Sequence, residues 1–224
     1  MQATETHTQT KACITLAFCQ RALKYILTYY FLLVTGFSFP QQSKIDSLLH
    51  SLKNAKYDTT KVNDLIQLCS ESRKLGSMQN AIEFGRQGIQ LAEKINYAKG
   101  LAQCYSNLAV IYNIKGNYDT ALSLYNNAYK QWEELTKSDD TSLSKTAYKG
   151  IGVILGNIGV TYEKLSDYSK ALDYQFQSLN IAETLNNKPG ISAALNNIGL
   201  NYSYLSDYPK ALDYQLQSLK IREE

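Results

Sequence analysis

The sequence predicts an all-α fold in which antiparallel helix-turn-helix repeats stack into a solenoid. The 224 residues include only 12 glycines and three prolines, few for a β protein that must turn about every ten residues. The stretch "LSDYSKALDYQFQSLNIAE" at 165–183 returns as "LSDYPKALDYQLQSLKIRE" at 205–223, with four of the nineteen positions changed. Self-similarity at a fixed period of this length indicates stacked repeats.

The first 40 residues are predicted to be a signal peptide or signal anchor. Residues 25–39, "YILTYYFLLVTGFSF", form an apolar run that follows Arg21 and Lys24 and precedes polar residues, the order that a secretory signal needs. The run is shorter than the ~20 residues that span a bilayer, which favours cleavage between residues 36 and 41. An uncleaved anchor and a buried core helix are the alternatives. We therefore expect an exported or periplasmic protein, free or membrane-anchored, with a cytoplasmic location as the alternative.

Residues 41–61 are expected to form a capping helix and a linker. The stretch "SKIDSLLHSLKNAK" at 43–56 places apolar side chains on one helical face, and that face would cover the first repeat. The apolar residues are Ile45, Leu48, Leu49 and Leu52.

The array is expected to run from residue 62 to 224. Its first helices carry related hexapeptides: "NLAVIY" at 107–112, "NIGVTY" at 157–162 and "NIGLNY" at 197–202. The first two lie fifty residues apart, and the surplus ten fit the polar stretch at 136–145, which is predicted to be a loop insertion. We expect about four repeats: 62–98, 99–145, 146–188 and 189–224.

The last repeat is expected to belong to a truncated array. Its second helix, from residue 208, has no following hairpin to cover the face that contains Leu212 and Leu219. Weak self-association through this exposed helix is therefore one expectation.

The pattern resembles the tetratricopeptide repeat, in the variant with a period near forty found in kinesin light chain-like arrays and bacterial sensor proteins. A small residue stands three positions before a tyrosine, a turn follows, and then an aromatic-x-x-Ala-Leu motif such as "YSKAL" at 168–172. The resemblance implies a right-handed superhelix with a concave surface lined by the first helices. Gln175 and Gln215 stand where the family usually buries an aromatic residue, so the sequence leaves open which residue there faces the core.

The candidate site is a second stripe on the first helices, made of residues that packing does not use. An asparagine opens the stripe three times, and its amide can both donate to and accept from the backbone of an extended peptide. The resemblance implies that role; the alternative is that the amides tie adjacent helices together. The predicted groove residues are Asn107, Val110, Ile114, Asn157, Val160, Lys164, Asn197, Leu200 and Tyr204.

Several function classes are poorly supported. Two histidines and no recognisable catalytic or phosphate-binding motif argue against an enzyme, a metal centre or a cofactor. A net charge of +3 without a basic block argues against nucleic acid as a partner. Asn63, Gln103, Val153 and Ala193 occupy the positions at which related co-chaperones grip a carboxylate, so that mode is not expected. Cys69 and Cys104 are interpreted as buried thiols.

We therefore expect a scaffold that binds a protein or peptide segment in its groove, as the exported sensory region of a larger bacterial signalling protein. The alternative is a structural self-assembly or membrane-complex scaffold without a peptide ligand.

Overall fold

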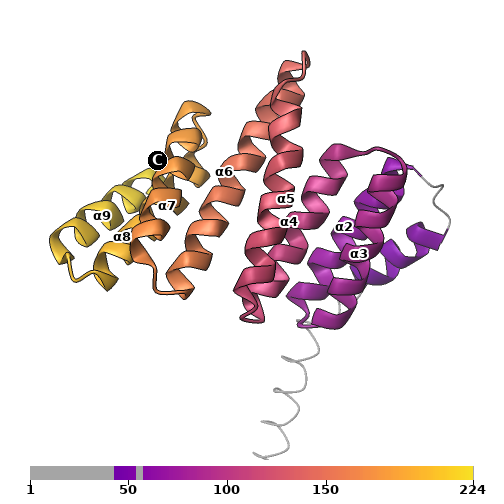
Figure 1. The fold of residues 1–224 in the computed structure, drawn as a ribbon, viewed down its shortest axis with the longest axis horizontal. Helices are drawn as coiled ribbons and strands as arrows, with labels where there is room; N and C mark the ends of the chain where they lie inside the picture. The colour runs from indigo at the N-terminus through magenta and orange to yellow at the C-terminus, as the bar shows by residue number, and fades with distance from the viewer. Residues whose placement is uncertain (1–42, 54–57, 224) are drawn as a thin grey trace, which may run out of the picture. The chain divides into compact units, whose positions relative to one another are not determined.

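The computed structural model describes residues 43–53 and 58–223, and within them it contains only helices and turns. The repeat array lies within the compact unit of residues 48–224 (Figure 1). The fold is thus the predicted all-α repeat solenoid. Its helices are α2 (Thr59–Lys74), α3 (Met78–Lys94), α4 (Ala98–Ile114), α5 (Tyr118–Thr136), α6 (Thr141–Lys164), α7 (Tyr168–Thr184), α8 (Lys188–Tyr204) and α9 (Tyr208–Glu223).

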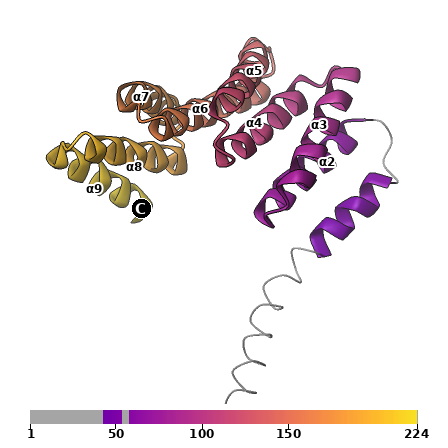
Figure 2. The ribbon, with the colours of Figure 1, turned by 60° about the horizontal axis from the view of Figure 1, so that its bottom comes forward.

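The helices of residues 59–223 stack as pairs, each with a first helix (α2, α4, α6 or α8) and a second helix (α3, α5, α7 or α9). Consecutive first helices come within 8 Å of one another between Cα atoms, whereas no two of the described second helices do. A stack bends toward the side on which its members approach more closely. The first helices therefore line the inner, concave side of the array (Figure 2).

The turn predicted before the aromatic-x-x-Ala-Leu motif is the "LSDY" segment in each of the last two pairs. Ser166 and Ser206 adopt φ values of 60° and 61°, in the left-handed region that ends a helix. Asp167 then begins α7, because its carboxylate accepts a hydrogen bond from the backbone N–H of Lys170 at 3.2 Å. Gly76 occupies the equivalent turn position after α2, with φ 76°.

The ten residues that break the forty-residue period, 136–145, are mostly helical, which corrects the prediction of a loop. α5 continues to Thr136 and α6 already begins at Thr141. The carboxylate of Asp140 accepts a hydrogen bond from the N–H of Ser142 at 2.8 Å and so caps α6. The insertion therefore lengthens this pair, to 19 residues in α5 and 24 in α6, where α7 and α8 have 17 each.

Gln175 is the residue of α7 that faces the core. It is fully buried at 0% exposure, while its neighbour Phe176 is 36% exposed. Its amide donates a hydrogen bond to the backbone carbonyl of Gly156 on α6 at 2.9 Å. Gly159 makes the room, since a Cβ at that position would lie 2.7 Å from Nε2 of Gln175. A polar side chain thus fills the space that Tyr125 fills at the equivalent position of α5.

Two further predictions concern the N-terminal part of the array. Cys69 and Cys104 are free and buried, as expected, and burial raises the pKa of their thiols to about 11 and about 12. Residues 43–53 are helical, and Leu52 packs against a cluster that includes Val62 and Leu65. The rest of the predicted capping helix, at 54–56, and the predicted signal lie outside the described residues.

Candidate functional site

The three predicted asparagines occupy equivalent, half-buried positions on α4, α6 and α8. Nδ2 of Asn107 donates to the backbone carbonyl of Ile66 at 3.4 Å, and Nδ2 of Asn197 donates to Oε1 of Gln175 at 3.5 Å. Both distances are long for hydrogen bonds. The side chain of Asn157 makes no hydrogen bond to any residue that the structure describes. Two amides therefore link neighbouring helices weakly, and the third retains its full hydrogen-bonding capacity.

The remaining predicted groove residues differ in depth. Those in the middle of the helices, Val110, Val160 and Leu200, are half-buried, whereas Ile114, Lys164 and Tyr204 at the helix ends are exposed. Nζ of Lys164 lies 3.1 Å from the carboxylate of Glu163, and this hydrogen bond raises the pKa of Lys164. The ring of Tyr204 stacks on Tyr168 with centroids 5.1 Å apart. The stripe thus combines an apolar middle with ends that differ in chemistry: aliphatic at Ile114, charged at Lys164 and aromatic at Tyr204.

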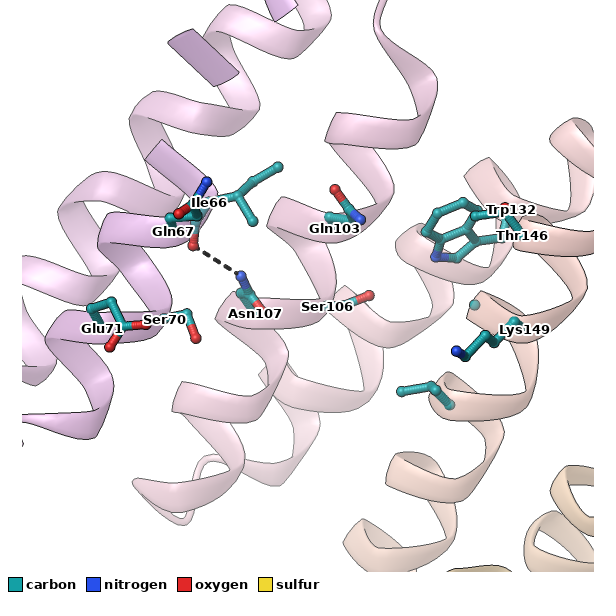
Figure 3. Close-up of a pocket in the computed structure, with 12 residues that line it drawn as sticks. Ile66, Gln67, Ser70, Glu71, Gln103, Ser106, Asn107, Trp132, Thr146 and Lys149 are labelled. Carbon is teal, nitrogen blue, oxygen red and sulfur yellow. Dashed lines mark hydrogen bonds between the residues drawn. The ribbon is translucent and has the colours of Figure 1, made fainter. Parts of the chain in front are cut away.

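A pocket of about 450 Å³ opens on the concave side between α2, α4 and α6 (Figure 3). Asn107 is the one predicted site residue that lines it. Amide and hydroxyl side chains form much of its wall, and an indole ring enters from α5. The lining residues are Ile66, Gln67, Ser70, Glu71, Gln103, Ser106, Asn107, Trp132, Thr146, Lys149, Gly150 and Val153.

Two charged side chains contribute to this pocket, with opposite consequences. Glu71 is 5% exposed, and Nζ of Lys74 lies 3.0 Å from its carboxylate, so its charge is balanced within α2. Lys149 is exposed on α6 and has no carboxylate partner among residues 43–53 and 58–223. The pocket therefore presents an unbalanced positive charge on its α6 side (Figure 3).

Sequence reasoning missed most of this pocket. Gln103 and Val153 entered the prediction only because they are not the basic residues that would bind a carboxylate. In the structure both side chains line the wall of the pocket. Trp132 belongs to the second helix α5, whereas the concave surface was expected to be lined by the first helices. The signal that could have directed attention here is the break in the period at 136–145.

Two general observations bound the chemistry of the described residues. They contain no group of three or more His, Cys, Asp or Glu side chains placed to hold a metal ion. Within the same residues, every helix is too short or too polar to cross a membrane. The apolar run at 25–39 lies outside this part of the chain.

Comparison with known sequence families gives two matches, both described as tetratricopeptide repeat. One covers residues 150–224 and the other residues 101–139, so together they reach from α4 to the end of the chain. A search of the curated proteins finds no relative.

Solved structures of low sequence identity share the fold. BtubC (BKLC) from P. vanneervenii is 22% identical with a TM-score of 0.67, over 82% of this chain and 74% of that one. A Rap protein complexed with competence and sporulation factor is 18% identical with a TM-score of 0.69, over 84% and 52%. A signal transduction ATPase with numerous domains and a tetratricopeptide repeat sensor, from Pyrococcus horikoshii, is 21% identical with a TM-score of 0.65, over 80% and 27%. The chain thus spans about half of the Rap protein and about a quarter of the ATPase.

Proposed function

Because the chain belongs to the tetratricopeptide repeat family, we propose that it is a protein–protein interaction scaffold whose concave face binds an extended segment of a partner. Repeats of this family generally serve as interaction scaffolds without catalytic groups. The observation that carries the proposal is the row of half-buried asparagines on α4, α6 and α8, which runs beside a pocket on the same face.

The hydrogen bonds that these amides make within the protein are weak or absent, so a peptide ligand can replace them. An extended peptide presents unpaired N–H and C=O groups along its length, and a side-chain amide can satisfy one of each. The bonds of Asn107 and Asn197, at 3.4 and 3.5 Å, are weak, and replacing them costs little. Asn157 has no described side-chain partner to give up. The half-buried Val110, Val160 and Leu200 add apolar surface beside the amides.

The test uses a peptide selected from a display library against the full chain. Asn157→Ala combined with Asn197→Ala is expected to weaken its binding about tenfold, with the loss of two peptide hydrogen bonds of about 0.5 to 1.5 kcal/mol each. Asn180→Ala, which removes an exposed amide from the second helix α7, is the matched control and should leave the affinity unchanged. Equal affinity of the double variant and the parent would refute the groove assignment.

We further propose that this scaffold is the sensory part of a larger signalling protein. The likeness to a Rap protein complexed with competence and sporulation factor, and to an ATPase with a tetratricopeptide repeat sensor, supports this role. Export is supported by the apolar run at 25–39 that follows Arg21 and Lys24. A fusion of residues 1–45 to a reporter active only outside the cytoplasm should be active; an inactive reporter would remove the export proposal and leave the scaffold proposal intact.

A further inference from the structure

The pocket between α2, α4 and α6 lies where the repeat period is broken. Lys149 and Thr146 line it from α6, which begins at Thr141. The position equivalent to Lys149 in the next repeat is Pro189, in the first turn of α8. The extension of α6 therefore places Lys149 about two turns inside a helix, where its backbone is held in place. The extended part of α6 also forms a wall of the pocket, and the next repeat has no equivalent of it.

Trp132 gives this pocket an aromatic wall that the neighbouring repeats lack. The equivalent residues of α3 and α7 are Ala92 and Ala182. Gly150 on α6 makes room for the indole, because a Cβ there would lie 2.5 Å from Cε2 of Trp132. The ring is 4% exposed and lies at the margin of the pocket in Figure 3. It is also the chain's single tryptophan, so its fluorescence reports on this place alone.

The chemistry of the wall indicates what would fill it. Ile66, Val153 and the indole offer apolar surface to an aliphatic side chain. Gln103 and Asn107 offer amides to a peptide backbone. Glu71 is already balanced by Lys74, whereas Lys149 lacks a described carboxylate partner, so the charge that complements this pocket is negative.

We infer that this pocket is a specificity subsite of the concave face, which takes an acidic residue and an aliphatic residue two positions away from an extended partner segment, because side chains two positions apart share one face of an extended chain. The inference rests on the proposed function, that the concave face binds such a segment. The inference adds two things to the proposed function. It places the specificity subsite at the pair of helices lengthened by the insertion, and it names the side chains of the partner that bind there.

The test is a fluorescence titration of the full chain with capped peptides that contain no tryptophan. The probe, called the Glu-Leu peptide, is the hexapeptide Glu-Glu-Leu-Leu-Glu-Glu, in which each Leu stands two residues from a Glu and shares a face with it. The comparison peptides replace Glu by Lys or Leu by Ser. The Glu-Leu peptide is expected to shift the Trp132 emission and to bind more weakly as salt is added. Lys149→Gln should weaken that binding about three- to fivefold and reduce its salt dependence, as for a partly exposed ion pair. Lys145→Gln, one turn away on α6 and outside the pocket lining, should do neither.

Each outcome separates this inference from the proposed function. Equal binding of the Glu and Lys peptides, or equal effects of the two lysine substitutions, would overturn the acidic specificity. The Glu-Leu peptide could also bind the parent without changing the Trp132 emission, and lose that binding in the Asn157→Ala, Asn197→Ala variant. That result would overturn the subsite and leave the groove proposal intact. Absence of binding by the Glu-Leu peptide, while a display-selected peptide still binds the groove, would also overturn the subsite alone.

Discussion

Replacing Gly150 by alanine should destabilise the array at the contact between α5 and α6. A Cβ at this position would lie 2.5, 2.7 and 2.8 Å from three atoms of the Trp132 ring system. The ring is large and 4% exposed, so it can yield only by disturbing its neighbours. Overpacking of this kind costs about 1 to 3 kcal/mol. Alanine recovers about 1 kcal/mol through its higher helix propensity. We therefore expect a net loss of up to about 2 kcal/mol.

Gly190→Ala is the matched control, because Gly190 holds the equivalent position at the start of α8. The nearest atom to a Cβ there is the amide end of Asn187, which makes no capping hydrogen bond and can rotate away. The next is the Cβ of Ala182 at 3.1 Å. This variant gains the same helix propensity at a smaller packing cost, so it should be more stable than Gly150→Ala. Urea unfolding followed by helical circular dichroism measures both variants. Equal midpoints for the two, or a more stable Gly150→Ala, would refute the packing argument.

Three further predictions concern Gln175, the turn at Ser166 and the two buried thiols. Gln175→Ala should lower the free energy of unfolding by about 2 to 3 kcal/mol, because it leaves a buried cavity and removes a hydrogen bond. Gln215→Ala should lower it by less than half of that, because Gln215 is half-buried. Equal losses in urea unfolding would contradict the burial of Gln175. Ser166→Gly should raise the thermal midpoint, with a gain of about 0.5 to 1 kcal/mol, since φ of 60° costs serine more than glycine; a lower midpoint would show that this turn is not strained. Burial raises the pKa of Cys69 to about 11 and that of Cys104 to about 12, so their protonated thiols contribute fully to stability below pH 9. Stability should fall by about 1.4 kcal/mol per pH unit for each thiol, between pH 9 and about 11 for Cys69 and between pH 9 and about 12 for Cys104. Cys104→Ala should show a shallower fall, and parallel profiles of the variant and the parent would contradict the burial of that thiol.

The repeat architecture could be predicted from the sequence because stacking imposes the same packing demand on every unit. The small residues Ala109 and Gly159 stand in equivalent aliphatic rows, and both are buried where first helices meet their partners. The "LSDY" turn was also predictable, because a capping aspartate and a following helix leave a local pattern. These features depend on neighbours in the sequence or at one fixed offset.

The pocket and the orientation of α7 could not be predicted in the same way. The burial of Gln175 depends on the space left by Gly159 and on the position of the Gly156 carbonyl that its amide meets, and both are properties of packed helices. The pocket brings together residues of α2, α4, α5 and α6. The polar composition of residues 136–145 indicated a loop throughout. Helix capping by Asp140 and the continuation of α5 to Thr136 leave only 137–140 outside the helices.

Site-specific photocrosslinking tests the central claim, that a partner segment binds on the concave face. A photoreactive amino acid replaces Val153, which is 54% exposed on the first helix α6, or Phe176, which is 36% exposed on the second helix α7. The probe is the display-selected peptide, at a concentration that saturates the full chain. We predict a crosslink from position 153 and none from position 176. A crosslink from position 176 alone would place the ligand on the second helices and contradict the concave groove.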